Sequence, residues 1–291
     1  MELAGGVVVG IGAPRDDVAF TLTERHDDDP RTVTVDSVAD SLEELRVRCR
    51  RWPRAAAICA DVLRTVDPHG PTRAGVVTES LAYSTLQAGP EFARWLAERG
   101  PATVPVLPDP VLAERRGDTL SVRFNRPQRH NAFSTDARAA LLEALEVARL
   151  DPSIDQVELS GAGRSFCSGG DLAEFGSFAD PASAHLARTR HSPALVLDEL
   201  TRRLDTRCRA RVHGQVLGSG LEMAAYCGWV ISTADAVFGL PELTLGLIPG
   251  AGGTVSITRR IGRERTAYLV LSGRTLDAGT ALRWGLVDRV E

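Results

Sequence analysis

The sequence predicts an α/β or α+β protein in which short strands are followed by turns and helices. Strand–turn–helix units of different lengths repeat from residue 119 onward, and Gly-rich turns precede several of the helices. Upstream of residue 100, apolar side chains recur at the three- and four-residue spacing of amphipathic helices. At 291 residues, with 43% hydrophobic and 25% charged side chains, the chain suits one large domain, or a core domain with a smaller segment.

The composition argues against several classes of protein. The net charge of −4 argues against a surface that binds nucleic acid, although all 34 basic residues are Arg. The N-terminus has no signal-peptide pattern and no stretch approaches about 18 apolar residues, so we expect a soluble, cytoplasmic protein without a membrane partner. No metal site or disulfide framework is indicated by the spacing of the cysteines, which are Cys49, Cys59, Cys167, Cys208 and Cys227.

Residues 1–110 are expected to form strands and then helices. Short apolar runs predict strands at residues 5–12, 18–23 and 31–35. Helical spacing predicts two further stretches, at residues 38–65, broken at Pro53, and at residues 78–99. Residues 100–111 carry four prolines and read as a linker, which places the domain boundary between residues 1–110 and 111–291.

Residues 111–291 carry the repeated strand–turn–helix units. Ser134 or Thr135 is placed to cap a helix that Asp151–Pro152 ends. Strands are predicted at residues 119–125, 156–160, 210–212, 230–233 and 236–238. Helices are predicted at residues 135–150, 182–203, 221–227 and 250–261.

Two Gly-rich segments with acidic side chains are the most informative feature of the chain. The first is residues 161–172 and the second is residues 213–254, which contains Glu222 and Glu242. Glycine lets backbone N–H groups approach a substrate oxygen closely, and a carboxylate beside that oxygen can move a proton. A single Gly-rich turn is common, but the pair predicts one site that binds a thioester and stabilises an oxyanion.

Five segments together carry a family resemblance: Phe124–Pro127 with Asn131–Ala132, Phe166–Leu172, Gly218–Glu222, Phe238–Thr254 and Ser272–Val287. In these segments residues 119–290 resemble the crotonase (enoyl-CoA hydratase/isomerase) superfamily. The motifs are highly specific in combination, and the resemblance covers about three-fifths of the chain. It implies a superhelical core of ββα units that binds acyl-CoA.

The resemblance also implies the roles of four residues. The thioester oxygen would lie between the backbone N–H groups of Gly170 and Ser219, each in a Gly-rich turn ahead of a predicted helix. Glu222 and Glu242 occupy the positions of the catalytic carboxylates of the hydratases, with Glu222 as the base toward water and Glu242 as the acid toward Cα. The alternative is that one of the two carboxylates only caps a backbone turn.

The same resemblance implies a channel for the substrate and its coenzyme A portion. Its residues would be Asn131, Ala132, Phe166, Ser168, Asp171, Leu172, Gly218, Pro241 and Gly250. Arg129 or Arg164 could contact CoA phosphates, but either could equally be a solvated surface Arg. Asp171 could instead hold its own turn in place, and Cys167 is expected to be a packed side chain rather than a nucleophile. Coenzyme A enters as part of the substrate, so no separate cofactor is expected.

The chain departs from the family pattern in three places. Ser219 stands where many relatives have Gly, and Gly228 replaces an Asp that usually ends its run. The sequence stops at Glu291, where relatives continue with helices that complete the acyl pocket and the trimer contacts. Residues 34–100 resemble those helices, which predicts an order equivalent to a circular permutation, with residues 100–111 as the connection. The alternative is an unrelated accessory domain.

The leading functional prediction is a hydratase that adds water across a 2-enoyl-CoA thioester, or eliminates it. The nearest alternative is an enoyl-CoA isomerase, although retention of Glu222 and Glu242 favours water chemistry; hydrolysis and decarboxylation stay open. A different class is a non-catalytic acyl-CoA-binding subunit of a biosynthetic complex. The resemblance also implies a homotrimer or a dimer of trimers.

Overall fold

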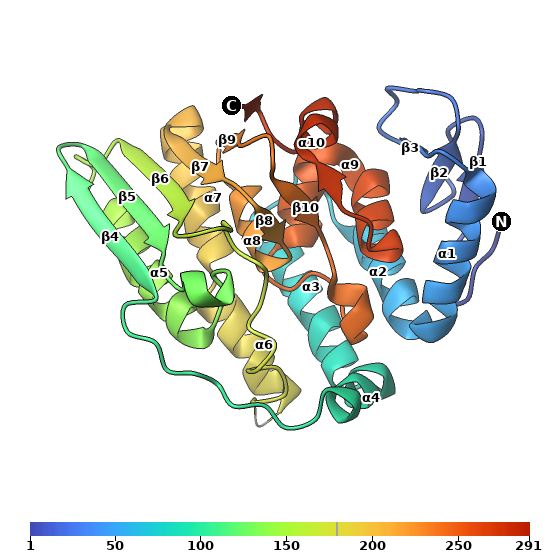
Figure 1. The fold of residues 1–291 in the computed structure, drawn as a ribbon, viewed down its shortest axis with the longest axis horizontal. Coiled ribbons are helices and arrows are strands. Elements are labelled where there is room, and N and C mark those ends of the chain that lie inside the picture. The colour runs from blue at the N-terminus through green and yellow to red at the C-terminus, as the bar shows by residue number, and fades with distance from the viewer. Residues whose placement is uncertain (179) are drawn as a thin grey trace.

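A mixed sheet forms one side of the molecule in the computed structural model, which describes residues 1–178 and 180–291 (Figure 1). In this described part the sheet has six strands, and all neighbours are parallel except the β4–β5 hairpin. The strands in spatial order are β12 (Arg289–Val290), β9 (Trp229–Ser232), β7 (Cys208–Val212), β6 (Gln156–Gly161), β5 (Thr119–Phe124) and β4 (Val111–Arg116).

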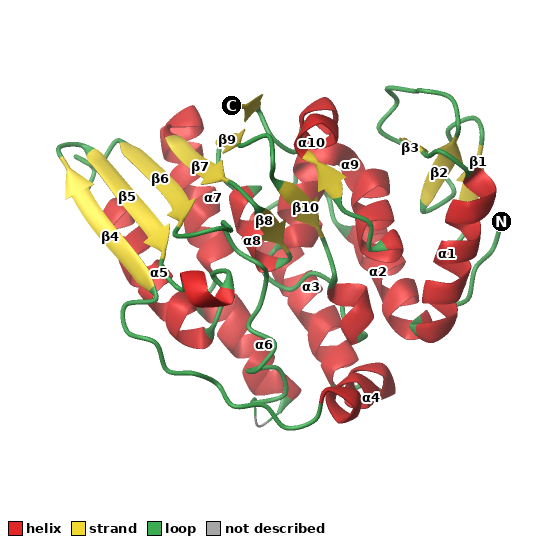
Figure 2. Ribbon diagram, viewed as in Figure 1, coloured by secondary structure: helices red, strands yellow, loops and turns green. Residues whose placement is uncertain are grey.

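A second, smaller sheet carries the segments that matter most for function. Its strands, in spatial order, are β11 (Leu276–Asp277), β10 (Val237–Gly239) and β8 (Gln215–Leu217). Helices surround both sheets, with α5 and α7 packed on the larger one (Figure 2). The helices of this half are α5 (Thr135–Leu150), α6 (Pro181–Arg190), α7 (Pro193–Leu204), α8 (Ser219–Ala224), α9 (Gly253–Ser272) and α10 (Ala278–Trp284), with short 3₁₀ turns η1 (Pro127–Arg129), η2 (Asp205–Arg207) and η3 (Glu242–Leu245).

The N-terminal part follows the predicted order of strands and then helices. Its three short strands form a parallel sheet of their own. The elements are β1 (Val9–Ile11), β2 (Phe20–Thr23), β3 (Thr32–Thr34), α1 (Val38–Arg51), α2 (Pro53–Thr65), α3 (Thr72–Gln87) and α4 (Pro90–Arg99). The break at Pro53 is confirmed, because α1 ends just before it and α2 begins on it.

Two helix predictions are wrong, and strand β4 was not predicted. The single helix expected at 78–99 is two helices, because Gly89 and Pro90 end α3 and begin α4. The helix expected at 182–203 also divides, at Pro193, which begins α7. Residues 111–116, ascribed to no element, form β4, whose mostly exposed side chains give no alternating apolar signal.

The N-terminal helices pack against α9 in the other half of the chain. Helices α1, α2 and α3 all contact α9, which bends at Gly262. The Arg48 guanidinium donates from Nε to the carbonyl of Leu271 at 2.9 Å, and Arg274 pairs with Glu44 at 2.8 Å. The segment 100–110 runs from α4 along the edge of the molecule to β4 (Figure 1). The two halves of the chain therefore share one core.

Glu91 joins α4 to the start of α2. The N-cap residue of α2, Trp52, makes no capping hydrogen bond with its side chain, so the first N–H groups of α2 need another acceptor. The Glu91 carboxylate, 2% exposed, accepts from the N–H of Arg54 at 2.9 Å and from the N–H of Ala55 at 3.0 Å. This contact supplies the cap from a different helix.

Replacement of Glu91 by Ala is expected to lower the free energy of unfolding by about 2 kcal/mol, because the buried N–H of Ala55 and the partly buried N–H of Arg54 lose their acceptor. Urea denaturation measures this, with Glu98→Ala as the matched control. Glu98 lies on the same helix and forms an exposed ion pair with Arg51, so its loss should cost less than about 1 kcal/mol. Equal effects of the two substitutions would contradict the cap.

Candidate active site

Three parallel segments meet at the carboxyl end of the smaller sheet. Strands β8 and β10 are in register, with Leu217 opposite Gly239, so α8 and η3 start at the same edge. The first Gly-rich segment joins them through a bridge between Cys167 and Val216, and Leu217 donates its N–H to the carbonyl of Cys167 at 2.9 Å. This geometry brings together the two Gly-rich segments that the sequence singles out.

Close backbone contact at this edge requires glycine. Gly218 has a positive φ of 47°, and a Cβ on it would lie 3.4 Å from the Cα of Gly169 and 2.5 Å from Oε1 of Glu242. A side chain there would separate the two turns and displace the carboxylate. The glycine therefore keeps Gly169 and Glu242 within reach of one another.

Two backbone N–H groups at this junction have no acceptor among residues 1–178 and 180–291. They belong to Gly170 and Ser219, and both residues line one cavity of about 290 Å³. Buried N–H groups are almost always paired in folded proteins. Two unpaired donors beside one cavity are what an oxyanion requires. The Ser219 hydroxyl is also buried there without a hydrogen-bond partner.

Glu222 and Glu242 reach the same cavity from different elements. Glu222 lies on α8, and its Oε2 accepts from the N–H of Ala251 at 2.7 Å and of Gly253 at 2.8 Å. Glu242 begins η3 and is 8% exposed, and its Oε2 has no hydrogen-bond partner within the described chain. One carboxylate is thus fixed on a loop, whereas the other presents an unpaired oxygen at the cavity.

Burial is the largest cause of the raised pKa values of Glu222 and Glu242. It raises the pKa of Glu222 to about 7, although the two N–H donors of the loop partly oppose the shift. Burial, and then the negative charge of Glu222, raise the pKa of Glu242 well above its usual range. At neutral pH this favours an ionised fraction of Glu222 beside a protonated Glu242, the division of labour that acid–base chemistry needs.

A third buried carboxylate, that of Glu79, was not predicted as a site residue. It lies on α3, and it accepts from the N–H of Gly252 at 2.7 Å and from the N–H and hydroxyl of Thr254 at 2.9 and 2.7 Å. Burial, followed by the charge of Glu222, raises the pKa of Glu79 to about 8. The loop before α9 is therefore held from both sides by glutamates.

Tyr83, one turn after Glu79 on α3, also lines the cavity without having been predicted. A Cβ on Gly250 would overlap its ring, so glycine at position 250 is what lets the loop lie against the aromatic face. The helical pattern of residues 78–99 predicts only that such side chains are apolar or packed. No local motif marks Glu79 or Tyr83, because their partners lie more than 150 residues away in sequence.

Nine of the residues predicted for the site line the cavity. These are Ser168, Gly170, Asp171, Leu172, Ser219, Glu222, Pro241, Glu242 and Gly250. The other five do not line it: Arg129, Asn131, Ala132, Phe166 and Gly218. Of these, Phe166 is completely buried, and Gly218 lies behind the cavity wall against Glu242.

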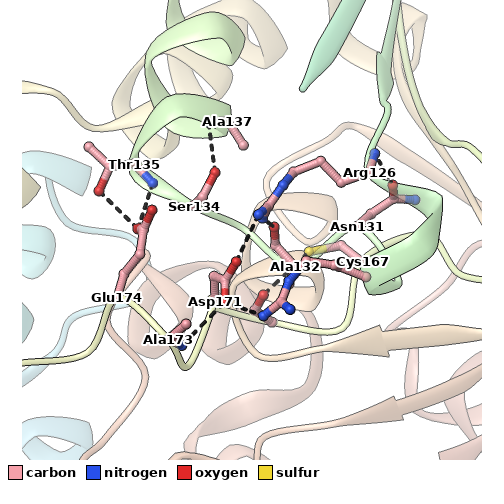
Figure 3. Close-up of polar contacts among 12 residues, drawn as sticks. Arg126, Asn131, Ala132, Ser134, Thr135, Ala137, Cys167, Asp171, Ala173 and Glu174 are labelled. Carbon is pink, nitrogen blue, oxygen red and sulfur yellow. Dashed lines mark hydrogen bonds and ion pairs between the residues drawn. The ribbon is translucent and has the colours of Figure 1, made fainter. Parts of the chain in front are cut away.

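Asp171 anchors the first Gly-rich turn through two arginines (Figure 3). Its carboxylate accepts from Arg126 and from Arg129, each at 2.8 Å. Burial alone would raise the pKa of Asp171, but the hydrogen bonds from Arg129 and Arg126 outweigh it and lower the pKa. Asn131 holds the neighbouring loop, because its Nδ2 donates to the carbonyl of Ala162 at 2.8 Å. These contacts leave the side chain of Arg129 engaged within the protein.

Comparison with known proteins places this geometry in a family. The family model described as enoyl-CoA hydratase/isomerase matches residues 114–291. The chain belongs to the enoyl-CoA hydratase/isomerase family. This agrees with the resemblance to the crotonase superfamily carried by the five sequence segments. Among the described residues, no helix is both long and apolar enough to span a membrane.

Relatives and solved structures agree with the family assignment. The probable enoyl-CoA hydratase echA8 of Mycobacterium tuberculosis is 36% identical over 182 residues, which are 62% of this chain and 68% of that protein. The 2,3-dehydroadipyl-CoA hydratase of Escherichia coli is 35% identical, with the same coverage of both chains. The structure of an enoyl-CoA hydratase from Thermoplasma volcanium has a TM-score of 0.54 at 34% identity, covering 62% of this chain and 71% of that one.

The carboxyl of Glu79 is expected to make stability fall as pH rises from about 5 to about 8. Its pKa is about 8 in the folded chain, against an unperturbed value of 4.5, so in this range the folded state binds the extra proton. Glu79→Gln removes the carboxyl group that titrates in this range, so the free energy of unfolding should depend less on pH. Urea denaturation at pH 5.5 and 8 tests this, with exposed Glu98→Gln as control. Parallel curves for wild type and Glu79→Gln would contradict the assignment.

Proposed function

We propose that this protein hydrates a 2-enoyl-CoA thioester, or dehydrates the corresponding 3-hydroxyacyl-CoA. The observation that carries the proposal is the meeting of two unpaired N–H donors with two buried carboxylates at one cavity. Family membership supports the class of reaction and the acyl-CoA substrate. Hydration needs an oxyanion site, a base for water and an acid for carbon, and this set of groups can supply each of them.

In the first step, Glu222 accepts a proton from water as the water oxygen bonds to Cβ. The electrons of the Cα–Cβ double bond then pass to the thioester oxygen, giving an enolate. The N–H groups of Gly170 and Ser219 would donate to that oxygen, and one such donor contributes roughly 2.7–4 kcal/mol to transition-state stabilisation. Glu222 suits the role of base because its carboxylate lines the cavity and its Oε2 is fixed by the N–H groups of Ala251 and Gly253.

In the second step, Glu242 gives its proton to Cα as the enolate collapses back to the thioester. Its raised pKa keeps it protonated at neutral pH, as an acid requires. The turnover ends when Glu222 releases its proton to solvent and Glu242 takes one up. An isomerase needs one carboxylate to shuttle a proton between Cα and Cγ, so the second carboxylate favours hydration over isomerisation.

The CoA portion is proposed to pass along the first Gly-rich segment. Ser168 and Leu172 line the cavity there and could flank the pantetheine chain, with Asp171 keeping the turn in shape. Asn131 and Ala132 would support the channel from behind rather than line it. Arg164 is exposed and is the better candidate for a phosphate contact than Arg129, which is paired with Asp171.

We also propose that residues 1–110 do the work of the helices that follow the core in relatives, in an order equivalent to a circular permutation. The packing of α1, α2 and α3 on α9 supports this, as does the supply of Glu79 to the loop at the cavity. An unrelated accessory domain would have no physical reason to provide such a group. A cytoplasmic homotrimer, or a dimer of trimers, is proposed from the family resemblance.

Wild-type protein is expected to hydrate crotonyl-CoA, measured as loss of the absorbance of the conjugated enoyl thioester. Glu222→Gln and Glu242→Gln should each lower kcat by about 10²–10⁴-fold, because each removes a proton-transfer group. Glu143→Gln, at an exposed position on α5, is the control and should leave kcat unchanged. Tight acyl-CoA binding with no turnover by wild type, across a panel of enoyl thioesters, would instead favour an accessory, acyl-CoA-binding role.

The rate of hydration is expected to rise with pH through about 7. Glu222 acts only when ionised, and its pKa is about 7, whereas burial raises the pKa of Glu242 well above its usual range and favours its protonated form. Measurement of kcat/KM between pH 5.5 and 8.5 tests this, because the pH dependence of kcat/KM reports the ionisation of groups in the free enzyme. A rate independent of pH below 7 would contradict Glu222 as the base.

A further inference from the structure

The wall of the cavity beyond the two glutamates is cationic. Arg138, in the first turns of α5, and Arg188, on α6, both line the same cavity as Glu222 and Glu242. Both arginines are half-buried. Within residues 1–178 and 180–291, neither lies within 4.0 Å of a carboxylate oxygen. The proposed hydration uses neither side chain.

Arg188 is held in place by neutral groups alone. Its Nε donates to the Ser80 hydroxyl at 3.0 Å and its Nη1 donates to the Gln87 side-chain oxygen at 2.9 Å. Its guanidinium lies 4.5 Å from the ring centroid of Tyr83, and the Ser84 hydroxyl accepts a further bond. A guanidinium has five N–H donors, so one on Nη1 stays available in a fixed orientation.

The guanidinium of Arg138, whose backbone N–H donates to the carbonyl of Ser134 at 2.9 Å, has no hydrogen-bond partner in the described part of the chain. The acidic side chain whose charge acts on the pKa of Arg138 is Glu174. The Glu174 carboxylate, however, accepts from the N–H and hydroxyl of Thr135 at 2.7 and 2.9 Å. Burial lowers the pKa of both Arg138 and Arg188, as expected for cations that lose water without gaining a counter-ion. Both remain charged at neutral pH, so this end of the cavity attracts an anion.

Arg188 is connected directly to the catalytic region. The ring of Tyr83 lies close to Gly250 and also lies 4.5 Å from the Arg188 guanidinium, so one aromatic side chain contacts both the cation and the loop that holds Glu222. Near Leu172, by contrast, the Arg99 guanidinium is occupied, because it donates to the carbonyl of Phe175 at 3.0 Å. With the CoA portion along Ser168 and Leu172, as proposed above, the rest of the cavity wall that remains for the acyl chain includes Arg188 and Arg138.

We propose that the preferred substrate is an enoyl-CoA whose acyl chain ends in a carboxylate, paired with Arg188 and Arg138. This inference rests on the proposed function, because it assigns the distal end of the same site. A planar guanidinium matches a carboxylate in geometry, and two of them offset the cost of taking its charge out of water. A purely aliphatic chain would leave both cations buried and unpaired.

The test compares binding of saturated thioesters in pairs of equal chain length: succinyl- with butyryl-CoA, glutaryl- with valeryl-CoA, and adipyl- with hexanoyl-CoA, by titration calorimetry. Wild type should bind the dicarboxylyl member of at least one pair about tenfold or more tighter. Arg138→Gln and Arg188→Gln should each reduce that ratio several-fold, whereas Arg188→Lys, which keeps the charge, should retain part of it. CoA is common to both members, so contacts with its phosphates cancel in the ratio.

Arg190→Gln is the matched control, because Arg190 is exposed on the same helix and lies outside this cavity. It should leave the ratio at the wild-type value. A ratio near one for wild type in all three pairs would overturn the inference, and so would an unchanged ratio in both arginine variants. Hydration of crotonyl-CoA is measured separately. Turnover without the preference would reject the substrate class alone, and absence of turnover on every enoyl thioester would reject the proposed function.

Discussion

Four consecutive backbone N–H groups, those of Ala251 through Thr254, donate alternately to two glutamates. Ala251 and Gly253 donate to Glu222, whereas Gly252 and Thr254 donate to Glu79. These groups form the N-terminus of α9, where N–H donors lack partners within the helix and positive potential accumulates. Without both carboxylates, buried donors would stay unpaired at about 1–3 kcal/mol each. The position of the proposed base therefore depends on a helix from the N-terminal part.

This arrangement gathers three carboxylates in one buried region, and only part of their charge can be present at once. Burial raises the pKa of Glu79, Glu222 and Glu242, and the charge of Glu222 adds to the shift of the other two. Glu222 is stabilised by two N–H donors, whereas Glu242 has an oxygen without a partner in the described chain. The environments thus separate the two catalytic candidates into a base and an acid, in a cavity that Arg188 also lines.

Nine of the predicted site residues line one cavity, and their catalytic roles stay predictions. Gly170, Ser219, Glu222 and Glu242 were named from the family resemblance that the local Gly-rich motifs carry, and all four line one cavity. Glu79 could not be found in this way. Its role depends on α3 docking against a loop far along the chain, and an acidic residue on an amphipathic helix gives the same pattern when it faces solvent.

The residues of the cavity wall also indicate how residues 1–110 relate to the rest of the chain. Three side chains of α3 contact the core. Glu79 accepts from Gly252 and Thr254, Ser80 accepts from Arg188, and Tyr83 lies against Arg188 and Gly250. Neither part alone would hold the loop before α9 or complete the cationic end of the cavity. A module that folds independently keeps its buried polar groups satisfied internally, because leaving them open costs stability. Here the donors to the Glu79 carboxylate, the N–H groups of Gly252 and Thr254 and the Thr254 hydroxyl, all lie across the segment 100–111, so both parts of the chain build this one cavity.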